Sequence, residues 1–495
     1  MGILRRLYRD NLGLATDLYQ MTMAYGYWKS GVCEKEAVFN LFFRQNPFNS
    51  GFTLAAGLTY LLDYLEDFHF DDSDLEYLGG ITGQDGRPLF EPAFLDFLHG
   101  LRLTLDLEAV PEGTVVFPHE PLVRVQGPLI QCQILETPLI NIINFQSLIA
   151  TKAARVCQAA QGEPVIEFGL RRAHGLDGGV AASWAAYIGG CAGSSNLLAG
   201  KLFGIPVKGT HAHSWVMSFN SEQEAFVAYA RNLPNNCVFL VDTYDTLAGV
   251  RQAVETGRWL REHGHSLLGI RLDSGDLAYL SIEARKILDA AGFQDAKILA
   301  SNDLDEHIIL SLKEQGAKIG VWGVGTRLVT AFDHPTLGVV YKMSALRSAG
   351  GPWQYKIKLS DQAAKVTDPG ILQVRRFYQA SGFLADMIYD LPLGIGKEAR
   401  IIDPEDMTRR KRVPEGTAYT ELLVPVMRAG RLVYQSPPAH LIKQYAIEQQ
   451  QQLHPGIKRF VNPHRYPAGL ESGLHELKMR LILEARNGRT PAAAT

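Results

Sequence analysis

The segments LLGIRLDSGD (residues 267–276) and KILASNDLD (residues 297–305) decide the fold that we expect for this chain. Each begins with an aliphatic run of strand length and ends in polar residues or glycine, and a plausible helix separates the two. The same rhythm continues on both sides, in VIEFGLRR (165–172), IPVKGTHAHS (205–214), CVFLVDTYD (237–245), KIGVWGVGT (318–326) and LGVVYKMS (337–344). Successive segments start about 20 to 40 residues apart, which is the repeat of β/α units in a parallel barrel.

Seven candidate strands, rather than eight, predict an irregular TIM-like α/β barrel of about seven strands. We assign residues 141–346 to this barrel domain. A doubly wound open sheet is the alternative fold. No G-x-G-x-x-G follows the first candidate strand, which weakens the dinucleotide-binding version of that alternative.

The regions outside the barrel follow a different pattern. Residues 1–140 mix strand signals with helical ones, including a helix that Thr16 and Asp17 are placed to cap. Residues 347–435 contain short strands and turns. We expect 1–140 and 347–435 to form one discontinuous α+β domain, made from both chain ends, on which the barrel packs. Residues 436–495 are predicted as a C-terminal helical extension that ends in a disordered tail, RTPAAAT.

Length and charge limit what this chain of 495 residues can be. The length prior is about three domains, or two where one is a large barrel. Lys and Arg together number 49 and Asp and Glu 52, so the formal net charge is −3. This balance excludes a strongly basic nucleic-acid-binding protein and a polyacidic tail protein. The 47 glycines exceed the average share of roughly 7%, and part of the excess stands at the predicted strand ends.

Cysteine usage and hydropathy indicate a cytoplasmic protein. The five cysteines are odd in number and widely spaced, and no C-x-x-C occurs, which argues against a disulfide framework or a structural zinc site. The N-terminal MGILRRLYRD lacks the apolar core of a signal peptide. The weakly polar run 178–193 is rich in small residues and short for a membrane span, so we expect a tightly packed internal helix. We therefore expect neither nucleic acid nor a membrane as partner.

Polar side chains gather where the predicted strands end, and in an α/β barrel that edge holds the site. Together with two glycines of a turn, these residues are Arg171, Arg172, Thr210, His211, His213, Asp242, Asp245, Arg271, Asp273, Asp276, Ser301, Asn302, Asp303, Gly323, Gly325 and Thr326. Arginine suits carboxylate or phosphate, and aspartate suits Mg²⁺ or ribose hydroxyls. A Gly-x-Gly-Thr turn lets backbone N–H groups approach phosphate oxygens. The set predicts a site for an anionic, phosphorylated, Mg²⁺-associated substrate.

Each of these residue types also has a purely structural interpretation. Arginine and aspartate at strand ends form ion pairs, glycine pairs serve tight turns, and DSGD (273–276) can act as a helix cap. Alternation along a strand puts His211 and His213 on one side, where an H-x-H pair can bind metal. The later strand ends offer Arg, Asp, Asn and Gly instead of the further His or Lys ligands that such a site needs. No G-x-x-x-x-G-K-[ST], H-E-x-x-H or G-x-S-x-G occurs, which argues against P-loop ATPases, zincins and α/β-hydrolases.

At these residues the chain resembles the nicotinate phosphoribosyltransferase family. The matching segments, in the expected order, are LATDLYQMTMA (14–24), EFGLRRAHGLDGG (167–179), GSSNLLAG (193–200), GTHAHS (209–214), IRLDSGDL (270–277), ASNDLDE (300–306) and GVGTRLVT (323–330). The C-terminal third matches less distinctively. The resemblance implies an irregular α/β barrel packed on a second domain made from both chain ends.

The resemblance also implies an activity of the ligase or glycosyltransferase type. Nicotinate attacks C1 of 5-phosphoribosyl 1-pyrophosphate and displaces pyrophosphate, giving nicotinate mononucleotide in the first step of NAD synthesis from nicotinate. ATP is a co-substrate whose hydrolysis is coupled through a phosphohistidine, and Mg²⁺ is the expected cofactor. A homodimer with shared active sites is implied as well, in which Tyr19 stacks on the ring bound by the neighbouring subunit.

The resemblance assigns roles to the matching residues. His213 is the expected phosphohistidine, and the expected catalytic residues are His213, Arg271 and Asp273, of which Asp273 suits ribose hydroxyls or Mg²⁺. Thr210 and Arg271 are expected to contact nicotinate, and His211 occupies a variable position. Phe168 and Arg171 stand where the related nicotinamide enzyme stacks the ring and binds phosphate. The expected substrate contacts are Tyr19, Phe168, Arg171, Ser195, Asn196, Thr210, Asn302 and, at the 5-phosphate, Gly323, Gly325 and Thr326.

Nicotinamide phosphoribosyltransferase is the first alternative function. That enzyme places an aspartate in the segment aligned with GSSN, where this chain has the uncharged Ser194, Ser195 and Asn196. An aspartate would repel nicotinate, so its absence favours the acid over the amide. Two further alternatives are a metal-dependent barrel hydrolase that uses His211 and His213, and a non-catalytic relative that binds nicotinate or NAD metabolites.

Overall fold

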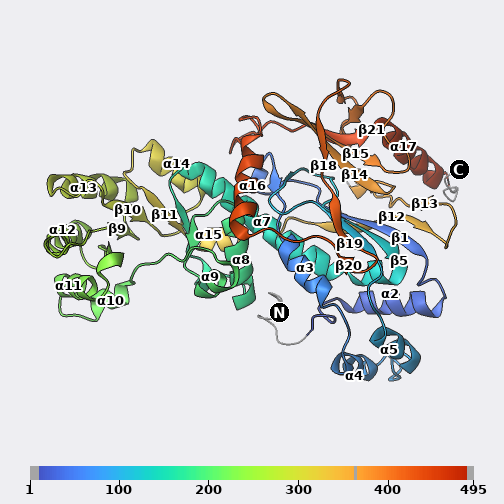
Figure 1. Ribbon diagram of the computed structural model, residues 1–495, viewed down its shortest axis with the longest axis horizontal. Coiled ribbons are helices and arrows are strands. Elements are labelled where there is room, and N and C mark those ends of the chain that lie inside the picture. Colours follow the sequence, from blue (N-terminus) through green and yellow to red (C-terminus); the bar gives the residue numbers. More distant parts are fainter. Residues whose placement is uncertain (1–10, 362–364, 488–495) are drawn as a thin grey trace. The chain divides into compact units, whose positions relative to one another are not determined.

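In the computed structural model, which describes residues 11–361 and 365–487, the aliphatic runs between residues 165 and 324 form a parallel β-sheet (Figure 1). The strands lie in the order β7-β6-β11-β10-β9-β8. Their bounds are β6 (Val165–Glu167), β7 (Gly193–Ser194), β8 (Val238–Leu240), β9 (Gly269–Leu272), β10 (Lys297–Ala300) and β11 (Val321–Val324). Most of their side chains are buried, as expected of a parallel sheet that crossover helices cover.

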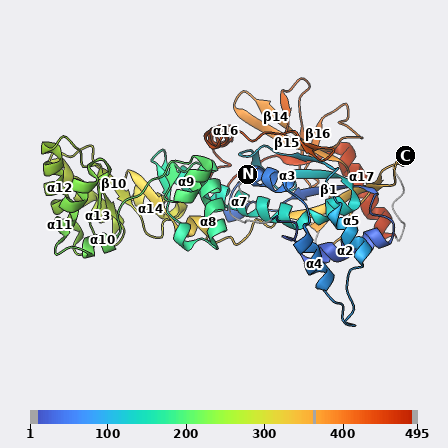
Figure 2. The same ribbon diagram turned by 60° about the horizontal axis from the view of Figure 1, so that its bottom comes forward.

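Helices connect these strands. They are η2 (Leu170–Arg172), α8 (Leu176–Ile188), α9 (Leu197–Phe203), α10 (His213–Met217), α11 (Glu222–Asn232), η3 (Pro234–Asn236), α12 (Thr246–Glu262), α13 (Leu277–Ala290), α14 (Glu306–Glu314) and α15 (Thr326–Val329). Helices α11, α12 and α13 lie side by side in both views (Figures 1 and 2). Helix α8 is almost wholly buried, which confirms the internal helix predicted near 178–193.

Capping accounts for some of the aspartates at the strand ends. Asp245 accepts a hydrogen bond from the first turn of α12, Asp276 from that of α13 and Asp305 from that of α14. A side chain that accepts from an otherwise unpaired N–H group stabilises a helix start by about 1 kcal/mol. The structural interpretation is therefore correct for Asp245 and Asp276.

The parallel sheet is open, with β7 and β8 as its edge strands, and its closure into the expected barrel stays a prediction. Strand β11 pairs with β6, so the last strand of the series lies beside the first. Within the described residues, no pairing joins β7 to β8. The expected strand at 205–214 is wrong: it makes only an isolated bridge between Val207 and Ser194, because helix α10 begins as early as His213. Strand β7 was not predicted from the sequence, because a strand of two residues shows no periodic pattern.

The expected barrel strand at 337–344 is also misplaced. These residues contribute to β12 (Val340–Arg347), which pairs antiparallel with β1 (Glu36–Phe42). Clustering of contacts accordingly divides the chain into Ile149–Pro335 and a second unit, Met1–Leu148 with Thr336–Thr495, rather than at 141 and 346. The first boundary falls inside helix α7 (Glu136–Ala160), whose helical pattern continues without a break.

The unit made from both chain ends is rich in antiparallel sheet. Among the described residues, one sheet has the order β13-β12-β1-β5-β3-β19-β20, a second β17-β16-β21-β15-β14-β18, and β2 pairs with β4. The remaining strand bounds are β2 (Thr53–Leu54), β3 (Asp106–Ala109), β4 (Val115–Val116), β5 (Val123–Pro128), β13 (Gln354–Tyr355), β14 (Leu372–Gln379), β15 (Gly382–Asp390), β16 (Arg400–Ile402), β17 (Arg410–Arg412), β18 (Tyr419–Glu421), β19 (Val424–Arg428), β20 (Arg431–Leu432) and β21 (Ala468–Glu471). Because β19 pairs with β3, the segments before and after the parallel sheet share one sheet, as predicted.

The helices of this unit are mostly short. They are α2 (Leu18–Lys29), η1 (Pro47–Asn49), α3 (Leu58–Glu66), α4 (Asp72–Gly80), α5 (Pro92–His99), α6 (Leu129–Ile134), α16 (Ala439–Gln451) and α17 (Ser472–Arg486), in addition to the start of α7. Helix α2 starts after Asp17 as predicted, but the Asp17 carboxylate accepts from Thr137 (2.7 Å) rather than from the helix. The part of the chain that the structure describes contains no helix of the length and hydropathy needed to span a membrane. It holds all five cysteines, each as a free thiol.

The segment 436–495 is not a separate extension, in contrast to the prediction. Strand β21 pairs in parallel with β15 and antiparallel with β16, and α17 packs on the same sheet. A strand of four residues is too short to stand out in the sequence. The predicted disordered tail lies outside the described residues.

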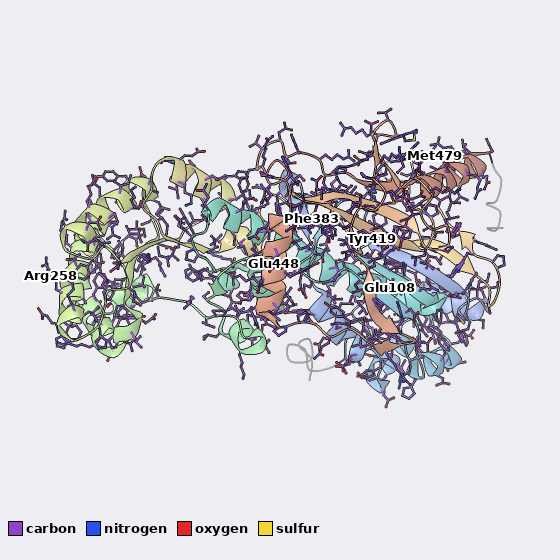
Figure 3. The ribbon with its side chains drawn as sticks, turned by 45° about the horizontal axis from the view of Figure 1, so that its top comes forward. Glu108, Arg258, Phe383, Tyr419, Glu448 and Met479 are labelled. Atoms are coloured by element: carbon purple, nitrogen blue, oxygen red, sulfur yellow. The ribbon has the colours of Figure 1, made fainter. Side chains whose placement is uncertain are left out.

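A buried arginine joins parts of this unit that are distant in the sequence. The Arg376 guanidinium pairs with Asp386 on the neighbouring strand and donates to the carbonyl oxygen of Val115 (2.8 Å) and to Gln449 (3.1 Å). It lies 4.4 Å from the centre of the ring of Phe383, which Figure 3 labels. Removing one partner of such a buried pair costs about 3–5 kcal/mol, since an unpaired charge remains.

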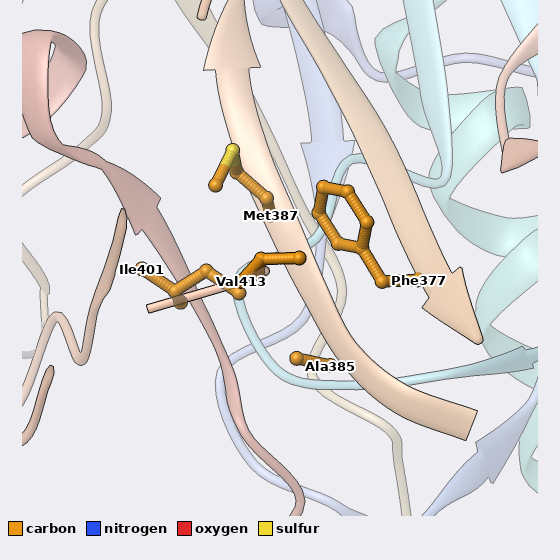
Figure 4. Close-up of a cluster of buried hydrophobic side chains, with 5 residues drawn as sticks. All are labelled: Phe377, Ala385, Met387, Ile401 and Val413. Carbon is orange, nitrogen blue, oxygen red and sulfur yellow. The ribbon is translucent and has the colours of Figure 1, made fainter. Parts of the chain in front are cut away.

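The second sheet of this unit carries a compact apolar cluster. The side chains of Phe377, Ala385, Met387, Ile401 and Val413 point toward one another from β14, β15, β16 and the segment after β17 (Figure 4). Their burial removes apolar surface from water, which stabilises the sheet at about 25 cal/mol per Å².

Met387→Ala should lower the free energy of unfolding by about 2–5 kcal/mol, because the thioether is fully buried and the cluster cannot collapse into the cavity. Urea denaturation measures the change. Met407→Ala is the control, since 48% of Met407 is exposed. Equal stability losses in the two variants would contradict the packing described.

Candidate active site

A pocket of about 470 Å³ opens at the carboxyl ends of the parallel strands. Its lining residues are Phe168, Leu170, Arg171, Arg172, Ser195, Gly209, Thr210, His211, Ala212, Arg271, Asp273, Ser301, Asn302, Asp303, Gly323, Gly325 and Thr326. Apart from segment 209–212, the lining comes from β9 and β11 and from the turns that directly follow β6, β7, β9, β10 and β11. Parallel pairing sends the carboxyl ends of all strands to one edge, which is why turns so distant in sequence meet here.

Most of the residues expected at the site line this pocket. They are Phe168, Arg171, Ser195, Thr210, Arg271, Asp273, Asn302, Gly323, Gly325 and Thr326. Three expected residues, Tyr19, Asn196 and His213, are not in the lining.

Gly323 in β11 and Gly325 directly after it make room for Phe168. A Cβ atom on Gly323 would stand 2.7 Å from two carbon atoms of the Phe168 ring, and one on Gly325 would stand 3.1 Å from the Phe168 carbonyl oxygen. The Phe168 N–H group in turn donates to the Val324 carbonyl oxygen (2.8 Å). Gly323 therefore lets the ring lie against the strand, a role that the phosphate interpretation of this turn did not include.

A half-buried arginine stands on β9 in the pocket. Arg271 donates through Nη1 to the Thr210 hydroxyl, while its Nε has no protein partner. Burial lowers the pKa of Arg271, Asp273 and Asp242 raise it, and Arg171 lowers it further. Arginine keeps its proton in proteins, so the group stays charged and suits a bound carboxylate or phosphate.

The turn after β9 is held by a second aspartate. Asp242 accepts from the Asp273 N–H group (2.8 Å) and from the Ser274 hydroxyl (2.6 Å). One Asp273 oxygen accepts from the Ser301 hydroxyl, and the other lies 3.8 Å from His213 Nε2. Asp242 therefore acts on the site through Asp273, which leaves Asp273 as the carboxylate available to a ligand.

His213 stands beside this carboxylate at the start of α10. Its Nε2 lies 3.8 Å from Asp273 Oδ2, and its Nδ1 lies 3.1 Å from the Thr243 hydroxyl. The side chain is 40% exposed, so a reactant can reach it. His213 thus adjoins the pocket without lining it.

The other histidine of the H-x-H pair faces the protein interior. His211 Nε2 accepts from the Leu240 N–H group (3.2 Å), and the ring packs against Tyr229 (5.0 Å between ring centres). Because its Nε2 is occupied in this way, His211 does not join His213 in a metal site. Across residues 11–361 and 365–487, no group of three or more His, Cys, Asp or Glu side chains is arranged to hold a metal ion. The inward position of His211 Nε2 argues against the metal-dependent hydrolase alternative, which needs His211 and His213 together.

A buried carboxylate that the sequence analysis did not single out organises one wall. Glu167 accepts hydrogen bonds from the Gly169 N–H group and from the hydroxyls of Ser183 (2.8 Å) and Ser194 (2.5 Å). Burial raises its pKa, and these three hydrogen bonds oppose the rise. Glu167 therefore ties the turn after β6 to the turn after β7; a carboxylate inside an otherwise apolar strand was the available signal.

Asn196 supports this wall and offers nothing to a ligand, in contrast to the expectation. Its side-chain oxygen caps α9, and its amide group donates to the Gly179 carbonyl oxygen (3.3 Å) and to Ser183 (3.1 Å). The side chain is fully buried. Of the three residues at 194–196, only Ser195 lines the pocket.

Two pocket residues have a strained backbone. Asn302 has a φ of 91° and Asp303 a φ of 42°, both in the left-handed region that side chains other than glycine rarely adopt. Such conformations cost about 1–3 kcal/mol and concentrate at functional sites. The strain aims the turn after β10 at the pocket.

Tyr19 lies in the other unit, on α2. It is 47% exposed, and Leu18 and Met23 on the same helix are exposed as well. Its expected role concerns a second subunit and stays a prediction.

Comparison with known proteins gives a consistent family. The chain matches the nicotinate phosphoribosyltransferase N-terminal domain over residues 14–144, the nicotinate phosphoribosyltransferase family over 164–368 and the C-terminal domain over 372–478. It is 44% identical over 485 residues to a nicotinate phosphoribosyltransferase of Bacillus subtilis, covering 97% of this chain and 96% of that protein. It is 38% identical to a nicotinate phosphoribosyltransferase of Dictyostelium discoideum, covering 95% and 88%.

Solved structures agree with the sequence matches. The crystal structure of human nicotinic acid phosphoribosyltransferase aligns with a TM-score of 0.81 at 32% identity, covering 94% of this chain and 99% of that one. A nicotinate-nucleotide pyrophosphorylase from Pyrococcus furiosus aligns with a TM-score of 0.67 at 22% identity, which shows a shared fold alone.

Gly323→Ala should displace the Phe168 ring and lower the free energy of unfolding by about 1–3 kcal/mol, because the added methyl group overlaps the ring. Chemical denaturation measures the loss, and a crystal structure of the variant locates the ring. Gly320→Ala is the matched control: its methyl group would meet nothing nearer than Lys297 Cδ at 3.8 Å. An unmoved ring in the Gly323 variant would contradict this account of the glycine.

Proposed function

The chain belongs to the nicotinate phosphoribosyltransferase family, and from that premise we propose that it transfers the phosphoribosyl group of 5-phosphoribosyl 1-pyrophosphate to nicotinate. The observation that carries the proposal is the half-buried Arg271 guanidinium, held by Thr210, in the same pocket as a Phe168 ring laid against β11. A pyridine carboxylate needs one cation for its carboxylate and one flat apolar surface for its ring.

The remaining lining suits the phosphoribosyl donor. Arg171 supplies a further cation, and the turn at Gly325 and Thr326 offers backbone and hydroxyl groups for the 5-phosphate. Asp273 and Asn302 carry the polar atoms that ribose hydroxyls require. Products would be nicotinate mononucleotide, used for NAD synthesis, and pyrophosphate.

The proposed transfer needs charge stabilisation more than proton transfer. The ring nitrogen of nicotinate is already nucleophilic, so no strong general base is required. As the bond to pyrophosphate breaks, positive charge grows on the ribose ring and negative charge on the leaving group. Arginine side chains at the pocket stabilise the leaving group electrostatically.

The residues present fit Mg²⁺ that is carried mainly by the substrate's phosphates. Asp273 keeps one oxygen on the side of His213 while the other accepts from Ser301. A single carboxylate beside phosphate oxygens is a frequent mode of Mg²⁺ binding in such sites. The ion would neutralise charge on the departing pyrophosphate, and Asp273 would hold it there.

We also propose that His213 accepts a phosphoryl group from ATP and so couples ATP hydrolysis to transfer. Thr243 holds Nδ1 of the imidazole, and Nε2 faces Asp273. Phosphorylation adds about two negative charges, which would reorganise the cations around the pyrophosphate. A homodimer in which Tyr19 reaches the neighbouring site completes the proposal, and the exposure of Tyr19 and Leu18 supports such a contact.

The direct test is incubation of the purified protein with 5-phosphoribosyl 1-pyrophosphate, Mg²⁺ and either nicotinate or nicotinamide, with and without ATP, followed by identification of the nucleotide. We expect nicotinate mononucleotide, formed faster with ATP. A preference for nicotinamide would favour the sister enzyme, and no nucleotide from either base would favour a non-catalytic relative.

His213→Ala should abolish the stimulation by ATP while a slow, ATP-independent transfer remains, because the phosphoryl acceptor is lost but the pocket is kept. Initial rates with and without ATP measure this ratio. His265→Ala, on the loop before β9 and outside the lining, is the control. Unchanged ATP stimulation in the His213 variant would refute the assignment.

Ser195→Asp should raise the KM for nicotinate by about tenfold or more, because a carboxylate in the lining repels the substrate's own carboxylate. Ser195→Asn supplies similar volume without charge and is the matched control. Steady-state kinetics with both bases measure the effect. An equal KM for nicotinate in the two variants would show that Ser195 does not face the base.

A further inference from the structure

We infer that His211 is a positioning residue for the transfer proposed above: its imidazole closes the open side of the parallel sheet and thereby holds Thr210 and His213 in register with β8 and β9. The inference rests on the proposed function for its kinetic consequence, whereas the contact itself is a property of the fold. It gives a role to the variable position between the two functional residues of the segment 209–214.

The segment before His211 is attached to β7 by backbone hydrogen bonds. The Ser194 N–H group donates to the Pro206 carbonyl oxygen (3.1 Å), and the Lys208 N–H group donates to the Ser194 carbonyl oxygen (3.0 Å). This ladder ends there, since only Val207 forms a bridge with β7. From Gly209 onward, side chains link the segment to the rest of the sheet: the Thr210 hydroxyl accepts from Arg271, and His211 accepts from Leu240.

Strand β8 presents an open edge to this segment. Directly after the strand, the Val241 N–H group donates to the Arg271 carbonyl oxygen (3.2 Å) on the β9 side. The Leu240 N–H group points to the opposite side and donates to His211 Nε2 (3.2 Å). The imidazole nitrogen thus stands where a carbonyl oxygen of an adjoining strand would stand in a closed barrel. A buried N–H group without a partner costs free energy, so this acceptor stabilises the contact between the segment 209–213 and the edge of β8, which we call the seam.

The surroundings of the ring keep it neutral and fix its tautomer. The ring is only 7% exposed and packs among Phe226, Tyr229 and Phe239. Nε2 must be unprotonated in order to accept from Leu240. Burial, with smaller contributions from Arg271 and His213, lowers the pKa of His211 to about 4, against the hydrogen bond to the Ala212 carbonyl oxygen, which raises it.

The charged and titratable groups around the ring come from three elements. Arg271 stands on β9, His213 begins α10, and the Tyr229 hydroxyl of α11 interacts with Asn236 (3.2 Å). None of them is a carboxylate that would favour the imidazolium form.

The residues flanking His211 are the ones whose positions matter for the reaction. Thr210 accepts from Arg271, and His213 meets Thr243. The first contact uses two pocket residues that a substrate would disturb, and the second uses the imidazole that the proposed phosphoryl group would occupy. The His211–Leu240 hydrogen bond uses neither, so it can hold the segment while those contacts change.

Two substitutions separate an acceptor from a mere space-filler. His211→Gln places an amide oxygen near the position of Nε2 without a titratable group, and His211→Leu fills the space with no acceptor. His265→Leu is the control, outside the lining of the pocket. Each variant is assayed for KM of nicotinate, for kcat and for ATP stimulation, and its folded fraction is measured by circular dichroism.

We expect His211→Leu to raise the KM for nicotinate and to weaken ATP stimulation, together lowering kcat/KM by about tenfold or more, and His211→Gln to restore values to within about threefold of the wild type. Equal kinetics of the folded Leu and Gln variants would overturn the inference and leave His211 a core residue.

A nitrogen-15 spectrum of histidine-labelled protein provides a readout that does not depend on activity. The histidine signal that disappears in His211→Gln is the signal of His211. At neutral pH it should show an unprotonated Nε2, and a protonated or freely exchanging ring would refute the contact.

The pH dependence of stability gives a second readout. The unfolded chain binds the His211 proton more tightly than the folded chain does, so the melting temperature of the wild type should fall relative to that of His211→Gln as the pH is lowered from about 6.5 toward 4. Parallel pH curves would likewise refute the contact. If the wild type and all variants were inactive while the nitrogen-15 signal and the pH dependence of melting were as expected, the proposed function would be refuted and the His211–Leu240 contact would stand.

Discussion

The pairing of β6 with β11 is the interaction on which the site depends. It brings the first strand of the parallel sheet beside the last, so that the Phe168 N–H group reaches the Val324 carbonyl oxygen (2.8 Å). Without it, the turn after residue 167 and the turn after residue 324 would lie at opposite edges of an open sheet. With it, the aromatic ring, the arginines and the glycine turn surround one pocket.

The wall of that pocket is built from buried polar groups that each serve two turns. Glu167 joins the turns after β6 and β7, and Asp242 holds the turn after β9 from the end of β8. In a buried setting these hydrogen bonds are strong and their loss is costly. Arg271 and Asp273 are therefore held in place by neighbouring polar groups, of which Thr210 and Ser301 line the pocket and Asp242 does not.

The open edge of the sheet leaves the segment 209–213 less constrained than a strand would be. A closed barrel fixes every strand by backbone hydrogen bonds, whereas here the segment 209–213 is fixed by side chains. Side-chain contacts can be changed one at a time by substrate binding or phosphorylation. The position of the proposed phosphohistidine on this segment is consistent with a step that alters its charge.

Much of the site was predictable because its residues follow strands whose pattern is visible. The aliphatic runs at 267–272 and 297–300 predict β9 and β10, and parallel pairing then predicts that Asp273 and Asn302 meet at one edge. The seam was not predictable in this way: the sequence at 205–214 looks like a further strand, yet α10 begins within it. Gly323 illustrates a third case, since its value to the site was foreseen and its contact with Phe168 was not.

By itself the sequence determined the parallel α/β class, the edge that carries the site and the chemical character of the pocket, because strand periodicity and residue type are local properties. Only the tertiary structure decided which side chains face the ligand and which support it. Asn196 caps a helix, His211 turns inward to Leu240, and Glu167 holds two turns together. Each of these outcomes depends on hydrogen-bond partners that are distant in the sequence or unmarked in its pattern, so only the folded chain shows them.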